Sequence, residues 1–171
     1  MDNVSITNNN ADDGLNIKYS NIMIKNSIFA GNYADQFDCD FCVWSVVSSK
    51  FHSLWDNIDG DGLDVSGSEV FVSDNEFLWF KDKGISVWEN SVIKIFDNKF
   101  IENNLGIAIK DLSKVFVKDN IFQDNTIDIN AYQKKEIFGW GTLYGLKEEL
   151  DKLNIQLDKK SEKININTED F

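Results

Sequence analysis

The sequence predicts an all-β fold in which the chain winds as a β-solenoid, a stack of coils built from short parallel strands. The first observation is a repeat whose reference positions are spaced by 22, 26, 22 and 22 residues: Gly14, Gln36, Gly62, Gly84 and Gly106. The second is an alternation of apolar and polar residues within each repeat, which is the period of a strand. A repeat of this length is too short for a strand-helix-strand crossover, so each repeat must form one coil.

Each repeat supplies two strands and then closes on an aromatic residue. In the repeat that begins at Gly62, the first strand places Leu63 and Val65 inward and the second places Val70 and Val72 inward. The aromatic positions of successive repeats are Phe29, Phe51, Phe77, Phe100 and Phe122. Two positions earlier stand Ser27, Ser49, Asn75, Asn98 and Asn120. Stacked at a strand spacing of about 4.8 Å, these polar residues are expected to form hydrogen-bonded ladders.

Both ends of the chain depart from the regular repeat. Val4 and Ile6 match the second strand of a coil whose first strand is missing, which predicts that the chain is a fragment of a longer protein. Near the other end, Leu146, Leu150 and Leu153 have helical spacing and predict a short helix. The predicted organisation is one domain over residues 1–171, with about six coils at about 4–132, a helical insertion at about 143–153 and a final partial coil at 154–171.

The composition limits the partners of this chain. Lys and Arg number 17 against 29 Asp and Glu, so the formal net charge is -12. This charge repels nucleic acid and anionic lipid and favours cations or positively charged partners. No apolar run reaches the length of a membrane-spanning helix, and residues 1–10 lack the parts of a signal peptide. We therefore expect no nucleic-acid binding and no membrane insertion.

Two cysteines, Cys39 and Cys42, form a single CDFC motif. A structural zinc site needs four ligands, and the absence of a second cysteine pair in the sequence does not favour one. We expect both residues to be small buried thiols.

The repeat sequences resemble a known family. GDGLDVSGS at 60–68 and DKGISVWENS at 82–91 are similar to coils of the right-handed parallel β-helix in the pectin-lyase-like superfamily. More narrowly, they resemble the β-helix repeats that accompany CotH-type spore-coat proteins. The resemblance implies right-handed winding, an extracellular or cell-surface location, and stacking on further coils of a parent protein. Because this fold hosts lyases, hydrolases, adhesins and inert spacers, it does not fix the function.

Aligning the coils places five acidic residues on one outward face, which we call the acidic face: Asp35, Asp38, Asp40, Asp61 and Asp64. Lys83 follows on the next coil. Like charges directly across a strand pair are destabilising, and Asp38 should lie about 5 Å from Asp64. A bound cation, a raised carboxyl pKa or Lys83 would offset the repulsion. Calcium fits best as the cation, because it takes six to eight oxygen ligands in irregular geometry.

Two classes of function remain open. The first is a non-catalytic β-helix module of a larger surface-associated protein, either a stalk or a carbohydrate-binding segment. The second, implied by the resemblance, is a calcium-assisted lyase acting on an acidic polysaccharide, with Asp35, Asp38, Asp61 and Asp64 as metal ligands and Lys83 as the base. A hydrolytic variant would use Asp38 and Asp64 as paired carboxylates. We favour the first class, since nearby carboxylates raise the pKa of Lys83 and the outward columns contain no arginine.

Three tryptophans are candidates for binding a sugar near the acidic face. Trp55 falls in a loop about four residues longer than its counterparts, Trp79 precedes Lys83, and Trp88 lies in an outward column. Exposed aromatic rings stack against the apolar faces of pyranose rings. Packing between turns is the alternative for Trp79, whereas Trp44 belongs to an inward pair and is expected in the core.

Overall fold

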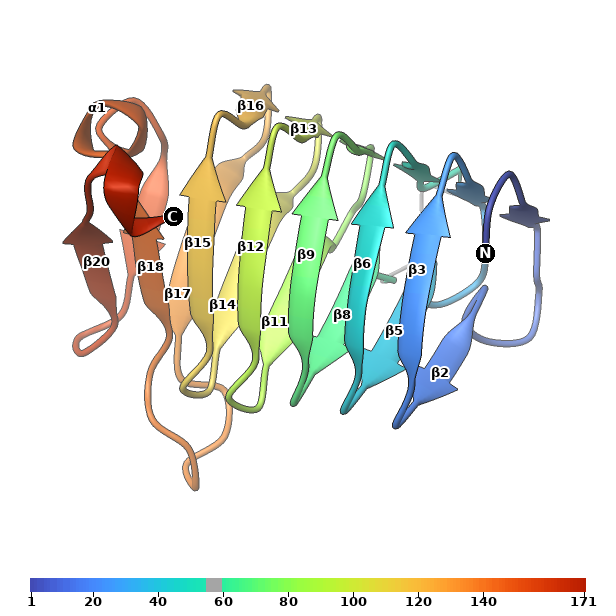
Figure 1. Cartoon of the computed structure of the whole chain (residues 1–171), viewed down its shortest axis with the longest axis horizontal. Coiled ribbons are helices and arrows are strands. Elements are labelled where there is room, and N and C mark those ends of the chain that lie inside the picture. The colour runs from blue at the N-terminus through green and yellow to red at the C-terminus, as the bar shows by residue number, and fades with distance from the viewer. Residues whose placement is uncertain (55–59) are drawn as a thin grey trace.

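The computed structural model describes residues 1–54 and 60–171 and is a three-sided parallel β-helix (Figure 1). The strands of each sheet pair in parallel, and each regular coil contributes one strand to each of three sheets. The predicted fold class is therefore confirmed. Two sheets contain seven strands, which makes about seven turns where about six were predicted.

Each coil runs from the first sheet to the second and then to the third. The first sheet contains β2 (Asn16–Lys18), β5 (Phe37–Asp40), β8 (Leu63–Ser66), β11 (Lys83–Trp88), β14 (Leu105–Lys110), β17 (Ile127–Tyr132) and β19 (Ile155–Leu157). The second contains β3 (Asn21–Lys25), β6 (Val43–Val47), β9 (Glu69–Ser73), β12 (Val92–Phe96), β15 (Lys114–Lys118), β18 (Thr142–Gly145) and β20 (Glu162–Asn165). The third contains β1 (Ser5–Thr7), β4 (Ile28–Ala30), β7 (Lys50–His52), β10 (Glu76–Leu78), β13 (Lys99–Ile101) and β16 (Ile121–Gln123). Two short helices, α1 (Lys147–Leu150) and η1 (Thr168–Asp170), complete the chain.

A stack of phenylalanine rings fills the core beneath the third sheet. Successive centroids from Phe29 to Phe122 are 5.0, 5.0, 5.0 and 4.9 Å apart, and the rings are nearly parallel. The first four rings have no exposed surface. Identical residues stack because the register aligns the same position of every repeat, as it does for Phe77 and Phe100.

The predicted polar ladder lies at the corner between the second and third sheets. The backbone N–H of Ser49, Asn75 and Asn98 each donates to the side-chain oxygen of the next coil at 2.9 Å. A second ladder, which the sequence analysis did not identify, occupies the corner between the third and first sheets. There the N–H of Asn103 donates to Asn125 Oδ1 at 3.0 Å. Both corners therefore satisfy their buried backbone donors with side chains of the adjacent coil.

The reference position is glycine in most coils because adjacent coils approach closely there. A Cβ atom at Gly62 would lie 2.4 Å from the carbonyl oxygen of Gly84, and one at Gly84 would lie 2.8 Å from that of Gly106. These separations are shorter than a carbon–oxygen contact allows, so glycine maintains the spacing of the coils.

The N-terminal prediction was wrong in its register. Ile6 pairs with Phe29 in the third sheet, whereas the sequence analysis placed Val4 and Ile6 in a second-sheet strand. The N–H of Val4 accordingly donates to Ser27 Oγ at 3.3 Å. A single pair of alternating apolar residues fits either sheet, so the pattern alone could not distinguish them.

The C-terminal helix is shorter than predicted. Residues 142–145 form β18, in which Leu143 continues the buried column of Val115, and only residues 147–150 are α-helical. Burial of Leu143 in the core favours a strand at residues 142–145 more strongly than the spacing of the leucines favours a helix there. After α1 the chain returns to the first sheet, where Ile155 of β19 pairs with Ile129 of β17. Within the described residues, no helix has the length and apolar character needed to cross a membrane.

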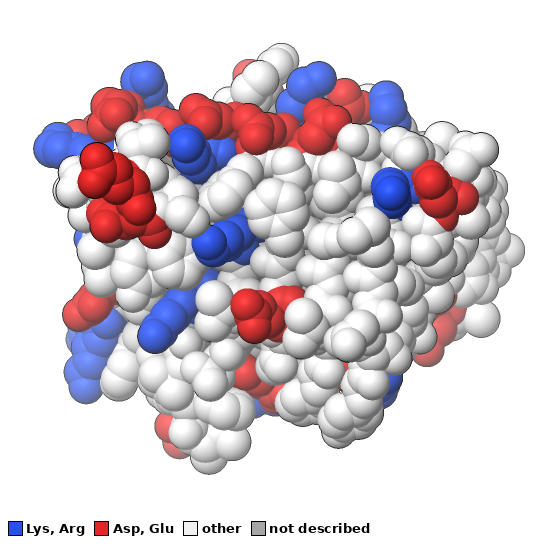
Figure 2. Space-filling model, viewed as in Figure 1, with Lys and Arg blue, Asp and Glu red and all other residues white. Residues whose placement is uncertain are grey.

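The outer face of the second sheet is mostly uncharged, with a few basic and acidic side chains scattered over it (Figure 2). Met23, Val43 and Phe71 are 54%, 58% and 39% exposed there. The chain covers part of this face with Phe171, whose ring lies 5.4 Å from that of Phe96. The charged clusters that could bind a ligand must therefore be sought on the other sides.

Candidate acidic binding face

The acidic face lies on the outer side of the first sheet and the corner that leads into it. The pairing of β5 with β8 sets Asp38 opposite Asp64 and Asp40 opposite Ser66. Asn16 is opposite Asp38 on the preceding coil, and Ser86 is opposite Asp64 on the following one. The columns predicted from the repeat are thus adjacent in space.

The corner carboxylates bind the backbone of neighbouring coils. Asp13 Oδ1 accepts a hydrogen bond from the N–H of Asp35 at 3.1 Å, and Asp35 Oδ1 accepts one from the N–H of Asp61 at 2.6 Å. A carboxylate that accepts a backbone N–H at a turn stabilises the turn itself. These two residues therefore have a structural role whether or not the face binds a ligand.

Burial and crowding shift the pKa values of the acidic face. Burial, with the nearby carboxylates of Asp64 and Asp13, raises the pKa of Asp35 to about 7. Burial, with Asp40 and Asp64, raises the pKa of Asp38 to about 7. Burial also raises the pKa of Asp61, although Lys83 opposes the shift. Bound protons therefore relieve part of the repulsion near neutral pH.

Lys83 is held between two carboxylates. Its Nζ lies 3.2 Å from Asp61 Oδ1 and also contacts the carboxylate of Asp82. Burial disfavours the ammonium charge, but Asp61 and Asp82 outweigh burial and raise the pKa of Lys83 above its ordinary value. A lysine that keeps its proton at neutral pH is a poor general base.

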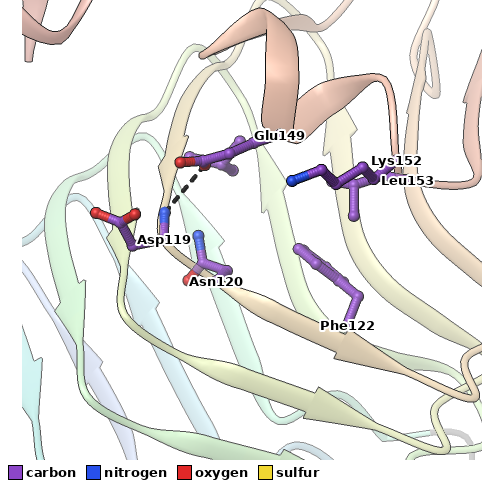
Figure 3. A pocket seen from close by; sticks show the side chains of 7 residues that line it. Asp119, Asn120, Phe122, Glu149, Lys152 and Leu153 are labelled. Atoms are coloured by element: carbon purple, nitrogen blue, oxygen red, sulfur yellow. Dashed lines mark hydrogen bonds between the residues drawn. The ribbon is translucent and has the colours of Figure 1, made fainter.

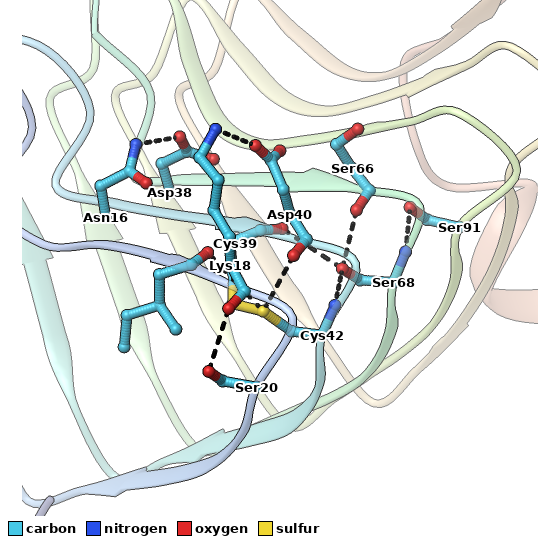
Figure 4. The surroundings of a disulfide bond; sticks show 11 residues. Asn16, Lys18, Ser20, Asp38, Cys39, Asp40, Cys42, Ser66, Ser68 and Ser91 are labelled. Atoms are coloured by element: carbon cyan, nitrogen blue, oxygen red, sulfur yellow. Dashed lines mark hydrogen bonds and ion pairs between the residues drawn. A yellow bond between two sulfur atoms is a disulfide. The ribbon is translucent and has the colours of Figure 1, made fainter.

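The other members of the face differ in their partners. Asp40 forms an ion pair with Lys18 at 2.5 Å, and Asp38 Oδ2 accepts a hydrogen bond from the Asn16 side-chain amide at 2.5 Å (Figure 4). Asp64 Oδ1 is buried and has no hydrogen-bond partner in the described residues. In residues 1–54 and 60–171, no three His, Cys, Asp or Glu side chains gather in an arrangement that could hold a metal. The unpartnered oxygen of Asp64 lies on the residue opposite Asp38 in the strand register.

The two cysteines form a disulfide beneath this face, so the prediction of free thiols was wrong (Figure 4). Cys39 points into the core from β5, and Cys42 is almost fully buried at the following corner. Between them Phe41 has a φ of 53°, which reverses the chain and brings the Cα atoms to 6.1 Å. This separation suits a disulfide, and the repeat could not reveal the direction of the corner residue.

The three candidate tryptophans have different surroundings. Trp55 lies outside the described residues. Trp79 is 43% exposed at the corner after β10, with its ring centroid 5.8 Å from that of His52 on β7. The ring of Trp88 has the ammonium groups of Lys134 and Lys135 at 4.3 and 4.2 Å from its centroid. Cation–π contacts therefore occupy Trp88, which the sequence analysis expected to be open to a sugar.

Sequence reasoning missed a group of residues beside the acidic face. Lys110 is almost fully buried and its Nζ donates to Ser86 Oγ at 2.6 Å, and burial lowers the pKa of Lys110. Asp111 Oδ1 accepts hydrogen bonds from the N–H groups of Lys134 and Lys135 at 2.7 and 2.9 Å. Lys110 shares the outward column of Trp88, so the repeat carried a signal for it. The segment that supplies Lys134 and Lys135 has no counterpart in other coils.

These features define a class: a three-sided parallel β-helix with an acidic outer face. Residues 1–125 match a family model described as "Right handed beta helix region". Since this match covers more than half of the sequence, the chain belongs to the right-handed β-helix family. No match was found among curated proteins or among solved structures.

Proposed function

We propose that this β-helix is a non-catalytic module of a larger, surface-associated protein and that its acidic face binds a divalent cation. The observation that carries the non-catalytic part of the proposal is the pairing of Lys83 with Asp61 and Asp82, which raise the pKa of its ammonium group. The larger protein would be of the CotH-associated type that the coil sequences resemble. In such a protein the coils would serve as a rigid, ligand-binding segment.

The partners of the acidic residues support a role without catalysis. Asp35 binds a backbone N–H, Asp40 binds Lys18 and Asp61 binds Lys83. A lyase needs a free base near neutral pH, and Lys83 does not provide one. The sequence contains no arginine that could assist in neutralising a uronate carboxylate.

Calcium is the cation that the face suits best. Asp64 Oδ1 has no partner in the described part of the chain, and Asp38 lies opposite Asp64 in the strand register. These two carboxylates would hold the ion, and its binding would remove the proton that burial favours on Asp38. Calcium accepts such oxygen ligands together with water, and extracellular modules bind it with Kd values of about 10⁻⁴ to 10⁻³ M.

Calcium titration followed by thermal unfolding tests this site. With 10 mM calcium and a Kd in that range, the free energy of unfolding should rise by about 1.4–2.7 kcal/mol. The increase should be larger at pH 8 than at pH 6, because protons compete for Asp38. Asp38→Asn and Asp64→Asn should remove the response, whereas Glu76→Gln on the third sheet should keep it. An unchanged melting temperature at 10 mM calcium would exclude the cation site.

One observation favours a second candidate, a glycosidase. With a pKa of about 7, Asp38 is partly protonated at neutral pH, as a general acid must be. Its partner in the register is Asp64, at the separation of about 5 Å typical of retaining enzymes. Incubation with acidic and neutral polysaccharides, followed by assays for reducing ends and for unsaturated uronates, separates the candidates. New reducing ends that depend on Asp38 and appear without unsaturated uronates would favour hydrolysis, and unsaturated products that depend on Lys83 would favour the lyase.

A further inference from the structure

The third sheet ends earlier than the other two. It stops at β16, whereas the first and second sheets continue through β17 and β18 to β19 and β20. At the level of the next coil, α1 replaces the expected third-sheet strand. The edge of β16 is therefore left without a neighbouring strand.

A cavity of about 350 Å³ lies between α1 and this edge (Figure 3). The ring of Phe122 and the side chain of Leu153 form its apolar lining, and Asn120, Glu149 and Lys152 contribute polar groups. Phe122 is the last ring of the core stack and is only partly buried, whereas the four rings before it have no exposed surface. The cavity thus lies against the last ring of the stack.

The hydrogen bonds at this edge show that a strand is missing. At the equivalent corner one coil earlier, the N–H of Asp97 donates to the carbonyl of Lys118 at 3.1 Å. The N–H of Asp119 donates instead to Glu149 Oε2 at 3.0 Å, so a side chain of α1 replaces a strand carbonyl. The N–H groups of Asn120 and Asp124 have no acceptor in the described part of the chain. Unpaired backbone groups on a strand edge are a template for another strand.

The geometry points to a peptide-binding site at the edge of β16, where an extended segment of a partner protein adds as the seventh strand of the third sheet. Such β-augmentation combines backbone hydrogen bonds with pockets for alternate side chains. The peptide would run parallel to β16, since every strand of this sheet is parallel. Its central side chain would enter the cavity over Phe122.

The fold itself specifies the chemistry of the peptide. An aromatic residue would continue the stack at about the 4.9 Å spacing of Phe100 and Phe122. A serine or asparagine two positions earlier would continue the polar ladder by accepting from the N–H of Asn120. A second copy of this chain is a poor source, because Phe29, Phe51, Phe77 and Phe100 are buried in their own core and the ring of Phe122 is stacked on Phe100 at 4.9 Å, so none is free to enter another molecule. We therefore assign the site to a different protein with an exposed Asn/Ser-x-Phe segment.

A synthetic hexapeptide with the sequence of residues 118–123, KDNIFQ, acetylated and amidated at its ends, is the probe. Titrated into isotope-labelled protein, it should shift the amide signals of Asn120, Phe122 and Asp124 in a saturable way and slow their hydrogen exchange. A peptide with Ala in place of Phe should bind at least tenfold more weakly. A peptide N-methylated on the residues that would pair with β16 should also bind at least tenfold more weakly, because it cannot complete the ladder.

Two protein variants complete the test. Phe122→Ala should weaken binding at least tenfold, whereas Phe116→Ala removes a ring from the outer face of the second sheet and should leave binding unchanged. If Phe122→Ala does not fold, the comparison of the three peptides on the unaltered protein still decides. Absence of any shift at millimolar peptide would overturn the proposal. Equal binding of the N-methylated peptide would overturn it too, since it would show a pocket for aromatic groups without strand addition.

Discussion

The phenylalanine stack in the core and the acidic face on the first sheet are built by the same geometry with opposite energetic results. Both bring equivalent positions of successive coils into register, as Phe77 with Phe100 and Asp38 with Asp64. Inside, the repeated side chains form aromatic contacts 5.0 Å apart. Outside, the repeated carboxylates repel one another, and burial together with this repulsion raises the pKa values of Asp35 and Asp38. Stacking of identical residues thus stabilises the fold only where the side chain attracts, and does not repel, the same side chain of the next coil.

The asparagine ladder shows what such complementarity requires. Asn98 accepts from the N–H of Asn75 at 2.9 Å and also donates to the carbonyls of Val72 and Phe96. A carboxylate can only accept, so a column of aspartates needs donors of another kind. The acidic face obtains them from Asn16, Lys18 and Lys83.

Removing one ring from the stack should have the largest effect. Phe77→Ala leaves a cavity between two buried rings, and we expect the free energy of unfolding to fall by about 3–5 kcal/mol. Equilibrium denaturation in urea measures this change. Phe71→Ala on the partly exposed outer face of the second sheet is the control and should cost much less. Similar losses in both variants would mean that the stack has no special weight in stability.

Breaking the ladder should have the next largest effect. Asn98→Ala leaves the buried N–H of Asn75 without its acceptor, which we expect to cost about 2–3 kcal/mol. Asn98→Ser should be milder, because Ser27 and Ser49 fill the same position in earlier coils. Denaturation midpoints of the two variants provide the measurement. An equal loss for serine and alanine would contradict the role of the side-chain acceptor.

On the acidic face, removal of a charge should stabilise the protein. The pKa of Asp35 is about 7 in the folded state, against about 3.9 in an unfolded chain. The folded state therefore binds this proton more tightly than the unfolded state does. The stability that the proton contributes is fully present below the unfolded pKa of about 3.9 and is lost as the pH rises through about 7. With allowance for solvent screening, Asp35→Asn should increase the free energy of unfolding at pH 8 by about 1–2 kcal/mol.

Denaturation at pH 6.5 and pH 8 checks this prediction. The unaltered protein should lose stability over this interval, and Asp35→Asn should lose less. An asparagine at position 35 can still accept the hydrogen bond from the N–H of Asp61, which is 2.6 Å long in the unaltered protein. Loss of this hydrogen bond therefore does not account for a difference between the two proteins. Asp124→Asn, which changes an exposed acid elsewhere, is the matched control. An identical pH dependence in all three proteins would show that Asp35 does not carry a raised pKa.

The smallest effect is expected for the exposed ion pairs of the third sheet. Glu76 bridges Lys50 at 2.9 Å and Lys99 at 3.1 Å, and both lysine side chains are about half exposed. We expect Glu76→Gln to change the free energy of unfolding by less than about 1 kcal/mol, because solvent and salt screen such pairs. Thermal unfolding at low and high salt measures the difference. A larger, salt-independent loss would give these outer charges a weight comparable to the ladder.

The interior and the columns of the acidic face could be predicted because one period governs both. Once Gly62 is aligned with Gly84, the neighbours of Phe77 and Asp64 follow. The disulfide could not be predicted, since Cys42 lies at a corner whose direction depends on the conformation of Phe41. The lysines over Trp88 could not be predicted either, because they come from residues 133–141, which have no equivalent in other coils. The repeat therefore predicts which residues stack on one another. The contacts of a segment without a repeat equivalent can be found only from the three-dimensional structure.

The close approach at the glycine column also has an evolutionary consequence. Each coil meets only the coils before and after it, so the rod can lengthen by duplication of one whole unit, such as residues 84–105. Every added unit would extend the rod by about 4.8 Å and recreate an interface that already exists. An extra residue within a strand would turn the core side chains that follow it to the outside. The corners absorb extra residues instead, since Leu63 pairs with Ile85 at a separation of 22 residues and Val70 with Ile93 at 23, with all four side chains buried. Selection on gene length would therefore act in whole repeats along the strands and in single residues at the corners.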